Sequence, residues 1–348
     1  MARIDSLLQL ARAQGSSDLH LAGGAPPRIR VRGELEPLAN APALTTAELE
    51  SAMSELLSAQ ERQEFSDFRD VEITYGLAGV ARFRVSYYTT LQGPAAVFRL
   101  VPEQALAIET LALPPAFEPL LSRRTGLVLL AAPHGSGRST LCASIVDRII
   151  GTSARVVVSI EDPIEVLHGR KQGVVLQREV GRDVPQWGEA FRAAERLDAE
   201  VIVAGDLPDA AALRAALHAA EGGRLVIAAV PVPGAVRAIE RLVDLLPAGE
   251  QLEIRAALAD NLLGVLSQVL LRRKDGNGRV AAHELLLTGP DVISSLREGE
   301  LRELAAVLDA GKGAGMQSLD DSIDRLLKAG VVVQEEAARK AVERARFA

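Results

Sequence analysis

The residues with the clearest chemical meaning form one short stretch, Ala132 to Thr140, which reads Ala-Pro-His-Gly-Ser-Gly-Arg-Ser-Thr. An apolar run from Leu127 to Ala131 precedes this stretch, and a run that fits a helix, Leu141 to Ile150, follows it. A glycine-rich turn between a strand and a helix can hold phosphates, because backbone N–H groups wrap the oxygens and the helix N-terminus favours negative charge. We predict a phosphate-binding loop whose nucleotide contacts are Gly135, Ser136, Gly137, Arg138, Ser139 and Thr140.

Two positions of this loop depart from the full pattern G-x-x-x-x-G-K-[ST]. Ala132 replaces the first glycine and Arg138 replaces the lysine, whereas Ser139 keeps the hydroxyl that ligates Mg²⁺ in such loops. Arginine keeps the positive charge, but its planar guanidinium cannot occupy the space of a compact ammonium without a rearrangement. Two interpretations stay open: a phosphate loop in which binding survives better than turnover, and a simple Gly/Ser turn between a strand and a helix.

Several strings along nearly the whole chain resemble the type IV pilus retraction ATPases (PilT-like) of the type II/IV secretion ATPase family. In the first hundred residues, the strings similar to that family's PAS-like N-terminal domain are Ser17 to Leu21, Pro26-Pro27, Arg30 to Gly33 and Ala81 to Val85. The later strings are the aspartate box Ile160 to Glu165 with His168, Gln177 to Asp183, Ser267-Gln268, Leu270 to Arg273, Gly278 to Ala282 and Gly315-Met316. Each string alone is a weak signal, whereas their number and order favour membership of the family.

The resemblance implies a hexameric ring motor that binds ATP with Mg²⁺ between neighbouring subunits. By the same resemblance, Glu165 would orient the attacking water and Ser139 would ligate Mg²⁺. Arg82, Arg84 and Arg99 resemble N-domain arginines that reach the phosphates of a neighbouring subunit, where a guanidinium suits charge spread over several oxygens. The alternatives are a helix-capping surface acid for Glu165 and solvated strand charges for the three arginines.

The positions that would support hydrolysis depart from the family pattern. Asp206 stands where the family has a glutamate, so its carboxylate is shorter by one methylene, and catalytic geometry is sensitive at the ~1 Å scale. Arg224 and Pro231 occupy the places of two histidines, and neither side chain can relay a proton near neutral pH. With the altered loop, these changes predict an ATP-binding protein of the type IV pilus (twitching motility) or related secretion machinery, with Glu165 and Asp206 as catalytic residues but with impaired hydrolysis. The alternative is a fully active hexameric ATPase that drives pilus retraction.

The composition of the 348-residue chain indicates a folded α/β protein. Hydrophobic residues make up 48% and charged residues 24%, which is the mix of a globular protein and not of a disordered one. Because only 3% of the residues are aromatic, the cores must consist mainly of aliphatic side chains, as suits helices packed on parallel sheets. The net charge of −7 argues against a nucleic-acid motor, which needs a basic stripe to neutralise phosphates.

The cysteine count and the length of the apolar runs indicate where such a chain works. Cys142 is the single cysteine, so the chain cannot form an intramolecular disulfide, and we expect a reducing, cytoplasmic location. A small buried thiol explains Cys142 more simply than a reactive one does. No run reaches the ~18 apolar residues of a membrane span, so we expect no direct membrane insertion. Membrane association would require a partner, such as the inner-membrane platform protein of a pilus or secretion machinery, and the hexamer could be homomeric or mixed.

The apolar pattern also predicts how the chain is divided. Residues 1–101 read as an α+β domain, PAS-like by the resemblance, and the prolines within 102–115 favour a linker. Residues 116–290 read as a RecA-like P-loop core, and residues 291–348 as a C-terminal helical cap.

Individual elements can be predicted within these divisions. In the first domain, the expected helices cover 4–13 and 46–64, with Thr45 or Thr46 as a plausible N-cap. In the core, continuous apolar runs are typical of parallel strands that are buried on both faces. These runs cover residues 126–131, 154–160, 200–204 and 224–229.

Overall fold

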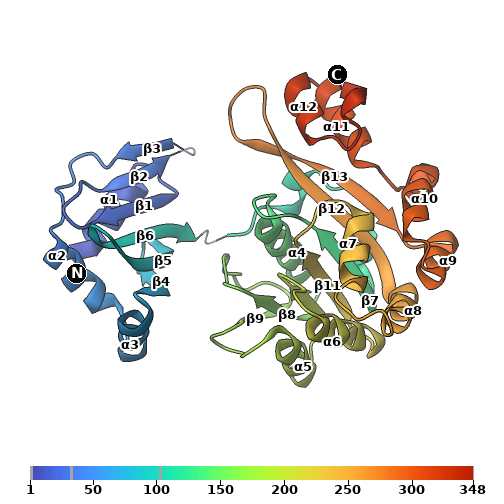
Figure 1. Ribbon diagram of the computed structural model, residues 1–348, viewed down its shortest axis with the longest axis horizontal. Coiled ribbons are helices and arrows are strands. Elements are labelled where there is room, and N and C mark those ends of the chain that lie inside the picture. The colour runs from blue at the N-terminus through green and yellow to red at the C-terminus, as the bar shows by residue number, and fades with distance from the viewer. Residues whose placement is uncertain (1–2, 32–33, 102–103, 348) are drawn as a thin grey trace. The chain divides into compact units, whose positions relative to one another are not determined.

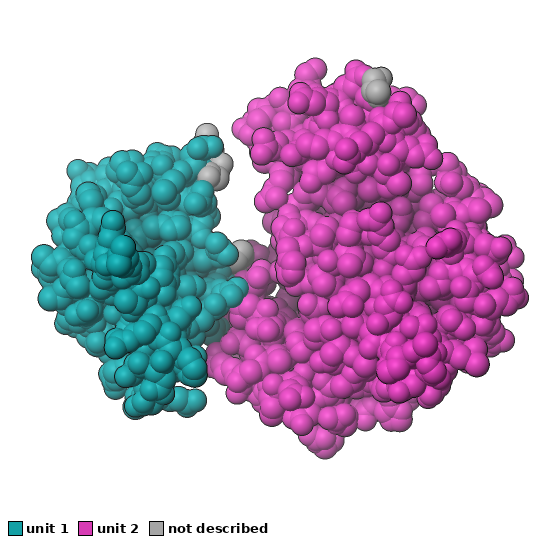
Figure 2. Space-filling model, in the orientation of Figure 1, with its two compact units in different colours: residues 1–103 teal, residues 104–348 magenta. Residues whose placement is uncertain are grey.

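The structure is a computed structural model that describes residues 3–31, 34–101 and 104–347 (Figure 1). Arg32 and Gly33, which belong to one of the strings that resemble the family, and the first two residues of the predicted linker, 102 and 103, lie outside the described residues. The chain forms two compact units, residues 1–103 and 104–348, which Figure 2 shows in separate colours.

Unit 1 is built around one antiparallel sheet. Its elements are α1 (Arg3–Ala13), β1 (Asp18–Ala22), β2 (Arg28–Val31), β3 (Glu34–Pro37), α2 (Thr46–Leu56), α3 (Ala59–Phe68), β4 (Asp70–Leu77), β5 (Ala81–Thr90) and β6 (Gly93–Val101). The strand order is β3-β2-β1-β6-β5-β4, and each neighbouring pair runs antiparallel.

Side chains of this sheet alternate between a buried face and an open face, as a pleated strand requires. On β5, Phe83 and Val85 are buried in a core that Met53 of α2 also enters. Arg82 and Arg84 occupy the alternate positions of β5 and are partly exposed. The pleat therefore brings the strand arginines to the face opposite the apolar core.

Two helices stand where the sequence predicted one continuous helix over 46–64. Thr45 is the N-cap of α2, as predicted, and forms a capping box with Glu48. The chain leaves the helix at Leu57, and Ser58 begins α3 with a second capping box that includes Glu61. The prediction of one helix was wrong because it overlooked this second Ser-x-x-Glu signal.

Unit 2 contains a seven-stranded sheet. Its elements up to the sheet's last strand are α4 (Arg138–Thr152), α5 (Trp187–Arg196), α6 (Ala210–Glu221), α7 (Ala235–Val243), α8 (Gln251–Asn261), β7 (Gly126–Ala131), β8 (Val156–Glu161), β9 (Val174–Glu179), β10 (Val201–Ala204), β11 (Leu225–Val230), β12 (Leu262–Arg272) and β13 (Arg279–Leu287). The strand order is β13-β12-β7-β11-β10-β8-β9. Only β13 pairs antiparallel, with β12 as its neighbour.

Helices cover both faces of this sheet, which explains its continuous apolar strands. All six residues of β7 and all six of β11 are buried. The helix α4 packs on one face through Leu141 and Ile145, and α6 packs on the other face through Leu213 and Leu217. The four strands predicted from apolar runs are present as β7, β8, β10 and β11, whereas β9, β12 and β13 were missed.

The segment expected to be a linker packs against unit 2. Ile108 begins a short 3-10 helix, Ile108–Leu111, and is 9% exposed in a core that includes Leu130 of β7. A second 3-10 helix, Glu118–Ser122, begins directly after Phe117. Over residues 104–115, the chain therefore belongs to the compact unit that follows it.

The C-terminal part of unit 2 is helical. Its elements are α9 (Pro290–Glu298), α10 (Leu304–Ala310), α11 (Leu319–Lys328), α12 (Gln334–Lys340) and the 3-10 helices Leu301–Glu303, Gly311–Ala314 and Arg344–Phe347. Ile323 of α11 shares an apolar cluster with Leu271 of β12 and Ala282 of β13. Figure 1 shows α11 and α12 beside the far part of the β12–β13 hairpin. Throughout the described ranges, no helix combines the length and apolar character that crossing a bilayer requires.

Candidate functional site

The predicted phosphate loop connects the end of β7 to the start of α4. Gly135 and Gly137 have φ angles of +75° and +84°, in the left-handed region that favours glycine. Gly137 is also the N-cap of α4, so the loop turns directly into the first helical turn. A Cβ atom at position 137 would lie 3.0 Å from Nε2 of Gln268, so a side chain there would press on a buried neighbour.

The start of α4 has backbone donors that fit an anion. Across the described parts of the chain, no hydrogen-bond acceptor is found for the backbone N–H groups of Arg138, Ser139 and Thr140. The first N–H groups of any helix lack a partner within the helix, and the helix dipole adds positive potential at that end. The loop therefore fits the phosphates of a nucleotide.

Neighbouring strands fix the shape of the loop. Ala132 donates its N–H to the carbonyl oxygen of Val230 at 3.0 Å. The carbonyl of Ser136 accepts a hydrogen bond from Nε2 of Gln268 at 2.7 Å, and the carbonyl of Gly135 accepts one from Arg279 at 3.2 Å. β11, β12 and β13 thus hold the loop from outside.

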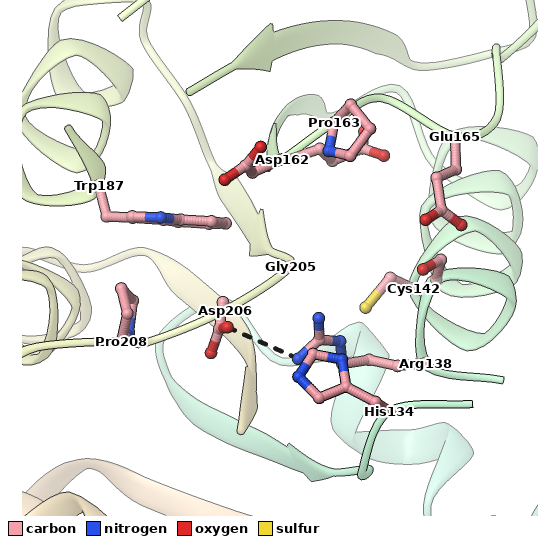
Figure 3. A pocket seen from close by; sticks show the side chains of 12 residues that line it. His134, Arg138, Cys142, Asp162, Pro163, Glu165, Trp187, Gly205, Asp206 and Pro208 are labelled. Carbon is pink, nitrogen blue, oxygen red and sulfur yellow. Dashed lines mark ion pairs between the residues drawn. The ribbon is translucent and has the colours of Figure 1, made fainter. Parts of the chain in front are cut away.

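A pocket of about 290 Å³ opens beside the loop, at the carboxyl ends of β7, β8 and β10 (Figure 3). Ligands bind at this edge in open sheets of parallel strands. The pocket is lined by His134, Arg138, Ser139, Cys142, Glu161, Asp162, Pro163, Glu165, Trp187, Gly205, Asp206 and Pro208. The structure therefore brings together the predicted site residues Arg138, Ser139, Glu165 and Asp206.

An ion pair joins the two sides of this pocket. Nη1 of Arg138 lies 3.6 Å from Oδ2 of Asp206, and the two side chains are 19% and 22% exposed (Figure 3). Burial raises the pKa of Asp206. The charge of Arg138 and the N–H of Leu207 act against that rise, and this N–H donates to Oδ1 of Asp206 at 2.8 Å. The separation exceeds a hydrogen bond, and within the described residues Nη1 of Arg138 is buried with no hydrogen-bond partner. A phosphate oxygen would satisfy it.

Two glutamates from the aspartate box line the same pocket but differ in environment. Glu165 is exposed in the loop that follows β8. Glu161, at the end of β8, accepts hydrogen bonds from Ser159 at 2.7 Å and from Gln177 at 3.0 Å. Burial raises the pKa of Glu161. Glu165 is therefore the glutamate with free access to a water or a substrate.

The loop that carries Glu165 is tied to α4 and β9. Asp147 of α4 accepts a hydrogen bond from Lys171 at 2.6 Å, and its other oxygen lies 3.9 Å from Nδ1 of His168. Glu179 of β9 accepts the N–H of Ile164 at 3.1 Å. These contacts set the distance between Glu165 and the phosphate loop.

Several lining residues, among them the three described next, were not predicted as site residues. His134 lies inside the phosphate loop, Glu161 is the second residue of the aspartate box, and Trp187 is the first residue of α5. Trp187 lies against the turn after β10, because a Cβ atom on Gly205 would be 3.7 Å from its ring. His134 and Glu161 lie within motifs that could have indicated them from the sequence, whereas no motif indicated Trp187.

The remaining predicted residues lie elsewhere or are inert. Cys142 lines the pocket but is buried, and burial raises its pKa to about 12, as expected for a structural thiol. Arg224 precedes β11 and lies 4.0 Å from Glu195, and Pro231 follows the same strand. Neither Arg224 nor Pro231 lines the pocket.

The arginines predicted to contact phosphates, Arg82, Arg84 and Arg99, belong to unit 1 and do not line this pocket. Arg84 forms an ion pair with Glu72. Arg99 donates to Asp18 at 2.8 Å. Burial acts to raise the pKa of Asp18, but the hydrogen bonds from Arg99 and Ser17 lower it below its usual value.

No group of three or more His, Cys, Asp or Glu side chains in the described residues is arranged to hold a metal ion. Ser139 and Asp206 line the same pocket beside the phosphate loop. In a P-loop, the metal ion is held by one hydroxyl, one carboxylate and the phosphates. The hydroxyl of Ser139 and the carboxylate of Asp206 would fit that arrangement.

Comparisons with known proteins agree with this geometry. A family model described as "Type II/IV secretion system protein" matches residues 1–309. The chain is 37% identical to the type IV pilus retraction ATPase PilT of Pseudomonas aeruginosa, over 97% of this chain and 98% of that protein. It is 36% identical to a twitching motility protein of Neisseria gonorrhoeae, over 97% of this chain and 90% of that protein.

A solved structure shows the same fold. The crystal structure of the pilus retraction motor PilT with bound ADP superposes with a TM-score of 0.92, covers 99% of each chain and is 32% identical. The predicted fold class, an α/β RecA-like core with an N-terminal domain, is confirmed by this match.

Proposed function

The chain belongs to the type II/IV secretion system protein family, in its type IV pilus retraction branch, and we propose that it binds ATP but hydrolyses it poorly. The observation that carries this proposal is the ion pair between Arg138 and Asp206. It joins the phosphate loop to the turn after β10, where a metal ion and the attacking water would need free carboxylate oxygens.

The binding half of the site supports nucleotide affinity. The N–H groups at the start of α4 and the guanidinium of Arg138 would bind the phosphates, and Ser139 would donate its oxygen to Mg²⁺. Mg²⁺ would neutralise charge that develops on the phosphates. Residues Gly135 to Thr140 would form the phosphate-binding loop, and most of its contacts with the phosphates would come from backbone N–H groups.

The hydrolytic half supports slow turnover. Glu165 can orient a water because it is exposed to the pocket. Asp206, however, is one methylene shorter than a glutamate and faces Arg138, so its oxygens are displaced from where a longer carboxylate would reach. We therefore assign Glu165 and Asp206 the catalytic positions of a weakened site.

We further propose that the chain assembles into a hexamer at the cytoplasmic side of a pilus or secretion platform protein. In such a ring, Arg82, Arg84 and Arg99 of one subunit would reach the nucleotide of its neighbour. Within one chain, Arg84 and Arg99 are paired with Glu72 and Asp18. Phosphate oxygens would replace these carboxylates as partners, since a guanidinium binds either group. Residues 1–101 would then act as a domain that moves separately from the core.

Phosphate release by the purified chain tests the proposal. The variant that combines Arg138→Lys with Asp206→Glu should release phosphate at least tenfold faster than the native chain, a change of about 1.4 kcal/mol in the activation barrier. Adding Glu165→Gln to this variant should remove the gain. Native turnover that the double variant does not exceed would contradict impaired hydrolysis.

Nucleotide binding is tested separately by the shift in melting temperature with ADP and Mg²⁺. A ligand at 100 times its Kd adds about 2.7 kcal/mol to the free energy of unfolding. No shift at millimolar nucleotide would contradict the binding claim, whatever the hydrolysis assay shows.

A fully active ATPase is the second candidate, because Ser139 and Glu165 both line the pocket. The same phosphate-release assay separates the two candidates. An active ATPase should lose turnover in the Glu165→Gln single variant and gain little from the double variant.

A further inference from the structure

Two buried polar side chains lie behind the phosphate loop, and one of them, Gln268, contacts it directly. Gln268 of β12 and His283 of β13 are direct neighbours in the register of the two strands. They are 2% and 1% exposed, in a region where their strand neighbours Leu266 and Leu285 belong to an apolar core. Buried polar groups at such positions cost free energy unless their hydrogen bonds are made.

These two side chains form a chain of hydrogen bonds that ends on the loop. Nε2 of Gln268 donates to the carbonyl of Ser136 at 2.7 Å, so its Oε1 is left as an acceptor. Nε2 of His283 lies 2.9 Å from that Oε1 and must therefore carry the hydrogen. Burial lowers the pKa of His283 to about 4, which keeps the ring neutral near pH 7.

The bond from Gln268 fixes the direction of one peptide group in the loop. In a trans peptide, the C=O and the N–H point in opposite directions. The Ser136 carbonyl points to β12, so the N–H of Gly137 in the same peptide points away from β12. Holding this orientation keeps a donor available on the side where an anion binds.

On the opposite face of the same two strands, the polar side chains contact α7 and not the phosphate loop. Ser267 and Glu284, which also face each other in register, accept the N–H groups of Gly234 at 2.9 Å and of Ala235 at 2.6 Å. They hold the start of α7, and within the described residues their side chains form no hydrogen bond with residues 132–140. Ser267 is therefore a matched control for Gln268: adjacent, buried and hydrogen-bonded, but not to the loop.

We propose that Gln268 and His283 are positioning residues that hold the Ser136–Gly137 peptide in the orientation that binds phosphate. This inference rests on the proposed nucleotide binding, because it assigns the residues that prepare that site. Gln268 acts on the loop directly, and His283 acts through Gln268 by fixing the direction of its amide.

The same pair connects the loop to the C-terminal helices. The backbone N–H of His283 donates to Oγ of Ser322 in α11 at 3.1 Å. The carbonyl of His283 accepts from Nε2 of Gln317 at 2.6 Å. Ser322 of α11 and Gln317, which precedes the N-cap of α11, therefore both hold the backbone of His283. Through His283 and Gln268, these contacts also support the orientation of the phosphate loop.

The test compares ADP affinity, by titration calorimetry with Mg²⁺, in four single variants. Gln268→Leu removes both side-chain bonds with little change in volume and should weaken ADP binding about tenfold, the usual scale for a lost buried hydrogen bond. His283→Phe should weaken it by less. His283→Gln, which can still donate an N–H, should bind nearly as the native chain does, and Ser267→Ala should stay within about twofold.

A double variant tests whether the two residues act in one chain of bonds. Gln268→Leu combined with His283→Phe should bind ADP no more weakly than Gln268→Leu alone, because His283 has nothing left to orient. Additive losses would overturn the proposed relay. Equal losses in Gln268→Leu and Ser267→Ala would overturn the positioning role, since both would then report only general destabilisation.

Hydrogen exchange of the nucleotide-free protein gives a readout that does not depend on binding. In Gln268→Leu, backbone amides in residues 134–140 should exchange about tenfold faster than in the native chain, while the same segment in Ser267→Ala should not change. If native protein binds no ADP, the proposed function fails, and the exchange data alone decide this inference. Unchanged exchange in Gln268→Leu would overturn it.

Discussion

The two sides of the pocket depend on different parts of the chain. The phosphate side is made by backbone: two left-handed glycines, the start of α4 and carbonyls held by β12 and β13. The hydrolytic side depends on the side chains of Glu165 and Asp206. Backbone donors survive substitution of neighbouring side chains, whereas a carboxylate shortened by one methylene loses its position. This difference supports the proposal that nucleotide binding persists while hydrolysis is slow.

The largest expected effect is the loss of ADP affinity when the phosphate side of the pocket is disrupted. Gly137→Val should reduce ADP affinity at least 100-fold, because a Cβ there meets Gln268 at 3.0 Å and φ is +84°. Titration calorimetry with ADP measures it. Gly181→Ala is the control, since Gly181 also has a positive φ but lies in open space. Native affinity in Gly137→Val would mean that the backbone does not form the site.

The next effect concerns His283, which supports the phosphate side through Gln268, and is measured as the pH dependence of stability. Because burial lowers the pKa of His283 to about 4 from an ordinary 6.5, the unfolded chain binds its proton more tightly. The free energy of unfolding should therefore fall as pH drops from 6.5 towards 4. His283→Gln should avoid roughly 3 kcal/mol of that loss at pH 4.

Chemical denaturation between pH 4 and pH 7 measures this difference. The exposed His218 provides the matched control, and His218→Gln should follow the native pH dependence. If the native chain and His283→Gln lose stability equally on acidification, His283 is not a buried neutral ring.

A smaller effect is expected where the two sides meet. Ser139→Ala should weaken ADP binding about tenfold with Mg²⁺ and hardly at all with a chelator, because only the metal ion needs the hydroxyl. Ser144→Ala, a buried serine of the same helix, should change neither value. Equal losses with and without Mg²⁺ would show that Ser139 does not serve the metal.

The smallest effect concerns the hydrolytic side. Asp206→Asn should strengthen ADP binding without Mg²⁺ by roughly fivefold, since Arg138 loses a partner worth up to about 1 kcal/mol and turns to the phosphates. Asp162→Asn, which removes another carboxylate from the pocket wall, serves as the control. Weaker binding in Asp206→Asn would show that the ion pair supports the loop and does not compete with phosphate.

The sequence predicted the phosphate side well because its signals are local. The strand, the glycines and the helix follow each other within about twenty-five residues, so spacing alone indicated the turn. Glu165 and Asp206 could be placed only through the resemblance, because the structure brings them from separate strand ends. Their distances from Arg138 could not be read from spacing.

The contact of Gln268 with the phosphate loop could not be predicted either, because it joins residues that are far apart in the sequence. Gln268 lies 132 residues after Ser136, and its contact depends on the register between β12 and β7, in which Ser267 pairs with Ala131. β12 and β13 were missed, and they form an antiparallel hairpin, whereas the four predicted strands pair in parallel. Residues 102–115 were predicted as a linker because their prolines break periodicity, yet Ile108 packs in the core of unit 2, a contact that no local pattern shows.

Trp187 gives the protein a built-in optical probe. It is the only tryptophan in the chain, and its ring lies on the pocket wall beside the turn that carries Asp206. Because the chain has no second indole, emission excited selectively from tryptophan reports on this wall alone. Nucleotide entry, exchange of Mg²⁺ and changes in the Arg138–Asp206 pair can therefore be followed in real time without attaching a dye.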